Sequence, residues 1–199
     1  MSQPSGSFRP TWQPATWNGH ATVRFGASGP SALTRAGSVI TGNSPRSVIV
    51  VASKTAGGPS GQAYVDLGAT SAGDGRAYIF SPEYSARFQA GNVAWLPGAP
   101  NGTPQVVSLV QSGTDTASIS LYENGALRQR TGTLTVALNT SGGTTIGHQT
   151  TTDFGNSYWA LRGDIGTVLV FDRALSASER CMCEQDLGRK YGVAVSCGG

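Results

Sequence analysis

The sequence lacks long apolar segments. No segment approaches the ~20 consecutive apolar residues that a membrane helix requires, and residues 1–7 contain neither the basic nor the apolar region of a signal peptide. We therefore expect no membrane insertion, and no export signal is visible.

Charged residues are also scarce, at 13% of the 199 residues. The formal net charge is +3, but twelve of the fourteen basic residues are arginines spread singly from Arg9 to Arg189, and the densest cluster of arginines is Arg128-Gln-Arg130. Nucleic-acid binding requires a concentrated basic stripe. We therefore expect no nucleic-acid partner.

Cysteine is limited to three residues near the end of the chain, Cys181, Cys183 and Cys197. The segment around the first two is predicted to be helical (below), and each helical residue turns ~100°, so these two thiols point ~200° apart and are poorly placed to ligate one zinc ion. Cys183 shares a helical stripe with Leu187 and Tyr191 that would face the core. We expect one disulfide, from Cys197 to Cys181 or Cys183, with Cys181 preferred.

Glycine, in contrast, is abundant, with 28 residues. Gly and the many Ser residues are unfavourable in helix interiors and serve turns, so the composition predicts short strands joined by turns. The length suffices for one domain with a substantial core. We expect an all-β domain at residues 18–199, preceded by an irregular Pro- and Trp-rich arm at residues 1–17.

Runs of β-branched and aromatic residues predict about a dozen short strands. Residues 47–52 form the most continuous apolar run in the first half and predict a central strand buried on both faces. The spacing of the runs is typical of a β-sandwich or jelly roll. The other predicted strands are 21–25, 63–67, 77–80, 86–89, 93–96, 105–110, 117–122, 126–130, 133–138, 144–146, 158–161 and 165–171.

One helix is predicted after the last strand. Ser176 and Glu179 have the spacing of a capping box, and Gly188 follows the last apolar residue as a helix stop does. The helix should therefore run from Ser176 to about Leu187. Asp164 and Asp172 flank the preceding strand and are assigned to turn hydrogen bonds.

Several motifs occur in a fixed order along the chain: Arg9-Pro-Thr-Trp12, residues 18–25, Ser47-Val-Ile-Val-Val51, Leu121-Tyr-Glu-Asn-Gly125, Thr145-Ile-Gly147 and residues 163–192. In this combination the chain resembles the concanavalin A-like lectin/glucanase superfamily, specifically the laminin G-like branch of bacterial surface proteins and phage virion proteins. The resemblance spans roughly residues 9–193. It implies a two-sheet antiparallel jelly roll.

Catalytic members of this superfamily hydrolyse or eliminate polysaccharides, and retaining hydrolysis needs two carboxylates ~5 Å apart. No two of the eleven acidic residues lie on one face of a predicted strand. The only histidines are His20 and His148; neither lies beside a nucleophile elbow, and His148 is expected in a solvated loop. We therefore expect no enzymatic activity.

Calcium is the one cofactor that the resemblance suggests, held by loop carboxylates and carbonyls. The candidate ligands are Asp66, Asp74 and Asp153, although they form no Asp-x-Asp cluster.

A sugar site on a β-sandwich combines an aromatic ring with hydrogen-bonding groups from loops at one end of the fold. The candidates here are Trp95, Asn101, Asp153, Asn156, Tyr158 and Trp159. Trp95 and Trp159 fit a role as packing aromatics at least as well. Trp12 and Trp17 are expected to pack the N-terminal arm onto the domain.

Two functions are consistent with this resemblance and with the lack of a catalytic pair. The first is a noncatalytic, lectin-like adhesion module that recognises a glycan or a surface protein. The second is a structural or decorating component of a phage virion or tail, in which the jelly roll contacts other virion proteins or further copies of itself. Both functions place the protein outside the cell or on a virion surface, and lysis releases a virion protein without an export signal.

Overall fold

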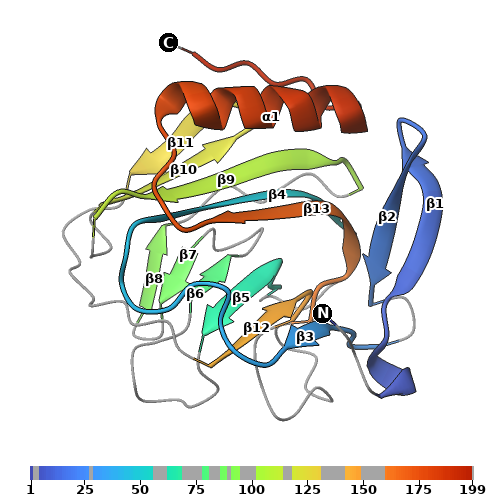
Figure 1. Ribbon diagram of the computed structural model, residues 1–199. Coiled ribbons are helices and arrows are strands. Elements are labelled where there is room, and N and C mark those ends of the chain that lie inside the picture. Colours follow the sequence, from blue (N-terminus) through green and yellow to red (C-terminus); the bar gives the residue numbers. More distant parts are fainter. Residues whose placement is uncertain are drawn as a thin grey trace.

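The computed structural model describes residues 1, 5–26, 29–55, 62–68, 78–80, 86–88, 91–94, 102–113, 118–130, 142–148 and 160–198. Two antiparallel β-sheets face each other, and one helix, α1 (Ala177–Tyr191), lies across the outer face of the larger sheet (Figure 1). The expected fold class, an all-β sandwich with one C-terminal helix, is confirmed. In the described part of the chain, no helix is long and apolar enough to span a membrane.

The larger sheet has seven strands and contains both the first and the last of the described strands. Its order is β1 (Thr11–Trp17), β2 (His20–Phe25), β13 (Gly163–Phe171), β4 (Arg46–Lys54), β9 (Gln105–Gln111), β10 (Ile119–Glu123) and β11 (Ala126–Arg130). The last strand of the chain thus lies between the second and the fourth.

The smaller sheet has six strands and packs against the inner face of the larger one. Its order is β3 (Leu33–Arg35), β12 (Gly143–Ile146), β5 (Val65–Gly68), β6 (Tyr78–Phe80), β7 (Ala86–Phe88) and β8 (Gly91–Ala94). A single 3₁₀ turn, η1 (Gly6–Phe8), precedes β1.

Strand β4 separates two hydrophobic cores. Val48, Val50 and Ala52 belong to the inter-sheet core, which lies between the two sheets. Ile49 and Val51 point the other way and belong to the helix-side core, which lies between the larger sheet and α1. Because strand side chains alternate between faces, one apolar run supplies both cores. The expectation that this strand is buried on both faces is confirmed.

Helix α1 begins as the capping box predicts. The Ser176 side chain accepts a hydrogen bond from the Glu179 amide at 3.3 Å, and the Glu179 carboxylate accepts one from the Ser176 amide at 2.9 Å. The predicted end near Leu187 is wrong, because the helix continues to Tyr191 and its left-handed C-cap is Gly192. Gly188 instead makes room for the chain that follows: a Cβ there would lie 2.6 Å from the Val193 carbonyl oxygen.

The N-terminal arm is not irregular where it meets the sheet. Residues 11–17 form β1, which pairs with β2 as a hairpin, so the expected arm over residues 1–17 is wrong for this segment. Pro14 lacks an N–H group but is tolerated because β1 is an edge strand with a bulge between Gln13 and Trp17. The expected turn at Asn18-Gly19 is present, with both residues at positive φ (48° and 76°).

Candidate functional site

The glycan-binding residues predicted from the sequence lie outside the described part of the structure. This applies to Trp95, Asn101, Asp153, Asn156, Tyr158 and Trp159. The glycan-binding site therefore stays a prediction.

Of the three predicted calcium ligands, only Asp66 lies in the described part of the structure. Asp74 and Asp153 lie outside the described residues, whereas Asp66 is fully buried in β5, opposite Thr145 of β12. The expectation that Asp66 lies in a loop is therefore wrong: its neighbours Val65 and Leu67 face the inter-sheet core, so Asp66 occupies the opposite face of the same strand. Across the described ranges, no three His, Cys, Asp or Glu side chains gather as a metal site would require.

Seven of the eleven acidic residues are described, and the structure assigns them to separate places. Asp164 lies within β13, not beside it as expected, and accepts two hydrogen bonds of 2.9 Å from Arg24. Those hydrogen bonds and the charge of Asp164 raise the pKa of Arg24. Among the described acids, only Glu123 lies on the inner face of its strand, because it continues the alternation of Ile119 and Leu121, which belong to the inter-sheet core. The described residues therefore contain no pair of carboxylates on the inner face.

His148 also differs from its expected position. It follows β12 and is only 2% exposed, so it is a buried side chain rather than a solvated loop residue. A sequence pattern ending in Thr-Ile-Gly gives no signal for this burial, because the packing comes from other parts of the chain.

The exposed aromatic ring that the sequence reasoning missed is Trp12. Its side chain is 68% exposed, whereas Trp17 is buried in the helix-side core. Trp12 lies directly opposite Val23 in the β1–β2 ladder, so the two side chains share one face of the sheet. That face continues into the inter-sheet core, against which Val23 packs. The alternation of side chains along a strand predicts this difference, because Trp12 and Trp17 are five residues apart and therefore point to opposite faces.

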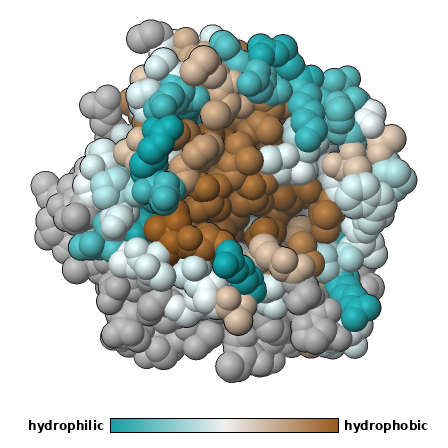
Figure 2. All heavy atoms as spheres, in the orientation of Figure 1, coloured by the Kyte–Doolittle hydropathy of each residue, from teal (hydrophilic) through white to brown (hydrophobic). Residues whose placement is uncertain are grey.

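An apolar cavity opens on the same face, between the two sheets. Its volume is about 210 Å³, and it is lined by Val23 and Phe25 of β2, Leu33 of β3, Ile146 of β12 and residues 165–168 of β13. Figure 2 shows hydrophobic residues gathered in a hollow at the centre of this view, with hydrophilic residues around part of its border. Below, "the apolar cavity" means this space.

A larger groove with a mixed polar and apolar lining lies at the far edge of the seven-stranded sheet. It has a volume of about 540 Å³ and is lined by residues 123, 124, 126–128, 196 and 198. Arg128 donates a hydrogen bond of 2.9 Å to Glu123, and Gln105 donates another to the same carboxylate. The charged groups of this groove are thus paired with each other.

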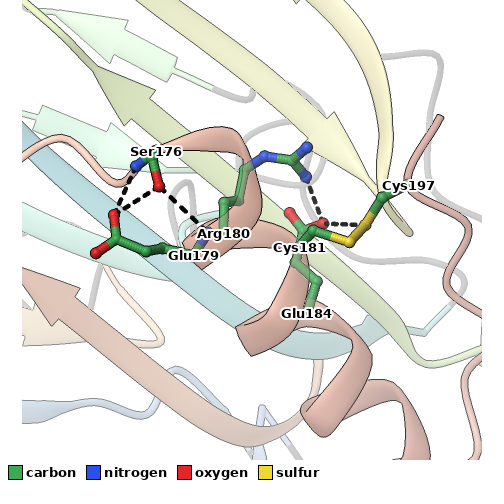
Figure 3. Close-up of a disulfide and its surroundings, with 6 residues drawn as sticks. All are labelled: Ser176, Glu179, Arg180, Cys181, Glu184 and Cys197. Carbon is green, nitrogen blue, oxygen red and sulfur yellow. Dashed lines mark hydrogen bonds and ion pairs between the residues drawn. A yellow bond between two sulfur atoms is a disulfide. The ribbon is translucent and has the colours of Figure 1, made fainter. Parts of the chain in front are cut away.

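The C-terminal segment that lines this groove is held by a disulfide between Cys181 and Cys197 (Figure 3). This is the pairing preferred from the sequence. The Ser196 amide donates a hydrogen bond of 3.0 Å to the Asn124 carbonyl, which fixes the C-terminal segment on the β10–β11 turn. Cys183 is the free thiol, and burial, followed by the nearby Asp186 charge, raises its pKa. At neutral pH it is therefore protonated and a poor nucleophile.

A buried ion pair lies beneath the helix beside the disulfide. Arg180 donates to Glu184 one turn later, and Cys197 Sγ lies 3.8 Å from the same carboxylate (Figure 3). The guanidinium of Arg180 also stacks over the ring of Tyr122, 3.6 Å from its centroid. These contacts fix α1 on β10, and they offer no exposed charge to a ligand.

The fold defines a class: a β-sandwich of a kind that occurs in sialidases and in carbohydrate-binding modules. No family model and no curated protein sequence matches the chain. Among solved structures, it is similar to the Trypanosoma rangeli sialidase in complex with sialic acid, with 16% identity and a TM-score of 0.54 over 74% of this chain. It is also similar to the CBM40 module of the Ruminococcus gnavus IT-sialidase bound to α2,3-sialyllactose, with 15% identity and a TM-score of 0.50 over 74% of this chain.

The two matched proteins differ in how much of their own length this chain covers. This chain spans 23% of the T. rangeli sialidase but 95% of the R. gnavus module. At these identities the likeness concerns the fold alone, and residue roles cannot be transferred from either protein.

Proposed function

We propose that the protein is a noncatalytic, lectin-like module that binds a glycan, and that it belongs to the laminin G-like branch of the concanavalin A-like superfamily. The observation that carries the proposal is the match to nearly the whole length of a carbohydrate-binding module that was solved with sialyllactose. The likeness to the sialidase covers only about a quarter of that enzyme. A match to the whole of a binding module and to only part of an enzyme favours binding over catalysis.

The proposed glycan site lies in the loops that carry Trp95, Asn101, Asp153, Asn156, Tyr158 and Trp159. A tryptophan face stacks on the apolar face of a sugar ring, and the amide and carboxylate groups bind hydroxyls. Asp153 and Asp74 are the proposed calcium ligands, and Asp153 belongs to the same stretch of sequence as Asn156 and Trp159.

The direct test is titration calorimetry with α2,3-sialyllactose, with and without calcium, with lactose as the control for the uncharged part of the ligand. A glycan array widens the search to other sugars. Trp95→Ala and Trp159→Ala should each weaken binding at least about tenfold, which corresponds to 1.4 kcal/mol. An array without any hit in either calcium condition would refute the proposal.

The absence of catalysis is tested separately with a fluorogenic α-ketoside of sialic acid. We expect no release of the fluorophore above the uncatalysed rate. Turnover that is lost in an Asp or Glu variant of this chain would show that the protein is an enzyme.

A second candidate function is a structural or decorating component of a phage virion or tail. The apolar cavity favours it, because a sugar-binding module has no need for an apolar opening between its sheets. A purified chain that is monomeric and has no affinity for virion proteins of the same genome would exclude this candidate.

A further inference from the structure

The groove at the far edge of the seven-stranded sheet is lined entirely by residues that the structure describes. One wall comes from the β10–β11 turn, between Glu123 and Arg128, and the other from the C-terminal segment at Ser196 and Gly198. Its volume of about 540 Å³ lies within the range of about 300–1,000 Å³ that is usual for small-ligand sites. The groove is therefore large enough to hold a small ligand.

Both walls of the groove are held in place by contacts within the chain. The Ser196 amide donates a hydrogen bond of 3.0 Å to the Asn124 carbonyl, and the disulfide of Cys197 ties the same segment to α1. The segment crosses Gly125 so closely that a Cβ there would lie 2.6 Å from the Ser196 carbonyl oxygen. The groove therefore exists before a ligand binds, and a ligand does not have to order either wall.

The carboxylate beside the groove is already paired. Glu123 is 9% exposed; Nε of Arg128 lies 2.9 Å from one of its oxygens, and Gln105 donates a hydrogen bond to the other. Both carboxylate oxygens thus have a donor from this chain. Glu123 therefore serves to fix the guanidinium of Arg128 rather than to receive a ligand.

The hydrogen-bonding groups that the lining leaves unused are mainly donors. A guanidinium has more N–H groups than one carboxylate engages, and Glu123 is the only polar partner of Arg128 in the described structure. Oδ1 of Asn124 accepts a hydrogen bond of 2.9 Å from the Val106 amide, while its Nδ2 has no partner among the described residues. Ser196 is exposed and adds a hydroxyl. A ligand that matches these groups is rich in acceptors.

We propose that this groove binds the carboxylate of an acidic sugar and that Arg128 is the residue that receives it. A planar guanidinium pairs with a carboxylate through two parallel N–H···O bonds, and Glu123 holds this guanidinium in position. The separate donors of Asn124 and Ser196 suit the hydroxyl groups of a sugar. Leu127, which is 45% exposed, offers apolar surface to the C–H face of the ring.

This inference rests on the proposed glycan binding and names the class of glycan. Arg128, Asn124 and Leu127 are different residues from the predicted loop candidates, so variants distinguish the two sites. A neutral sugar gains little from the groove, because only an anion forms charge-assisted bonds with the guanidinium.

The test compares each acidic sugar with its own methyl ester. α2,3-Sialyllactose and a glucuronate-containing tetrasaccharide carry their carboxylates on different sugars, and both are titrated against the full chain by calorimetry. We expect at least one acid to bind about tenfold or more tightly than its ester, because the ester has lost the charge that pairs with Arg128. Hydrogen exchange with that acid should show increased protection at residues 123–128 and 196–198, and none at 166–171.

Two variants assign the effect to the guanidinium. Arg128→Lys keeps the positive charge beside Glu123 but removes the planar pair of donors. It should weaken binding of the acid about tenfold or more and leave binding of the ester unchanged. Arg189→Gln is the matched control, because the side chain of Arg189 is 71% exposed and does not line this groove, and it should bind the acid like the wild type.

Three outcomes would overturn the inference. If acids and esters bind alike and Arg128→Lys changes neither, the protein binds glycans but not through this groove. If the acid is lost in Trp95→Ala but not in Arg128→Lys, its carboxylate binds in the predicted loops. If no sugar binds, the proposed function fails as well, and binding of a peptide with a free C-terminal carboxylate, but not of its amide, would assign the groove to peptides.

Discussion

The two faces of the seven-stranded sheet are made of the same kinds of residue but are closed in different ways. On the helix side, α1 covers the apolar face, and a capping box, a buried ion pair and a disulfide hold the helix and its tail in place. On the inner side, the smaller sheet covers most of the face but leaves the apolar cavity open beside β13. Apolar composition alone therefore does not decide which face is sealed. The sealed face is where we expect stability to depend on single residues, and the open one is where we expect recognition.

The largest expected difference between the two faces is in the stability that is lost when one apolar side chain is replaced by alanine. Ile49→Ala should lower the free energy of unfolding by about 2–5 kcal/mol, because the side chain is fully buried under the helix. Val168→Ala, at the half-buried wall of the cavity, should cost less than about 1.5 kcal/mol. Urea unfolding followed by circular dichroism measures both. Equal losses would mean that the two faces are equally closed in solution.

The disulfide should have the next largest effect. Cys181→Ser removes a cross-link between residues 16 positions apart and should destabilise the fold by about 3 kcal/mol in the chain-entropy account. Cys183→Ser is the control, since this cysteine is free, and should cost less than about 1 kcal/mol. Denaturant unfolding without reductant gives both values. Similar losses in the two variants would show that the cross-link adds no stability of its own.

The capping box should have a smaller effect, confined to the start of α1. Ser176→Ala should cost about 1 kcal/mol, because the Glu179 amide loses its acceptor. Ser178→Ala, an exposed position in the same turn whose hydroxyl lies 3.2 Å from that of Ser176 but does not cap a backbone amide, should stay within about 0.5 kcal/mol of the wild type. Thermal unfolding of the three proteins side by side ranks them. A larger loss at Ser178 than at Ser176 would contradict the cap assignment.

The smallest expected effect is a pH dependence at the same cap. Hydrogen bonds from Arg173, and then those from Ser176, lower the pKa of Glu179 to about 2 from its usual 4.5. A carboxyl group with a lowered folded-state pKa stabilises the fold above its unfolded pKa, and this contribution is lost as the pH falls from about 4.5 to 2. Stability measured over that range should therefore fall less steeply in Glu179→Gln than in the wild type. A steeper fall in the variant would reverse the sign and reject this role.

The features that the sequence predicted correctly depend on local patterns. The continuous apolar run around Ile49 and the spacing of Ser176 and Glu179 each require a few neighbouring residues, and the structure contains both the central strand and the cap. Two of the misread residues, Pro14 and Gly188, have strong local preferences that the surroundings override. Pro14 is accepted by an edge strand, and Gly188 serves the packing of the returning tail rather than a helix stop.

The apolar cavity had no local signal at all. It lies where the pairing of β2 with β13 ends at Ile165, and the rings of Tyr191 and Trp17, which come from distant parts of the chain, lie beside Gly166. The predicted glycan-binding residues, including Trp95 and Trp159, lie outside the described residues, so calorimetry on their variants is what tests them.

The place of β13 between β2 and β4 has a consequence for how the protein is made. Its residues, 163–171, leave the ribosome after every other described strand, so the larger sheet cannot join its two parts until this segment has been made. Such pairings between distant segments close slowly, because the loop entropy has to be lost before the contacts form. Until then, the edge of β4 that β13 will cover is available to other chains. The growing polypeptide therefore has a period in which its most apolar strand needs a chaperone more than the finished protein does.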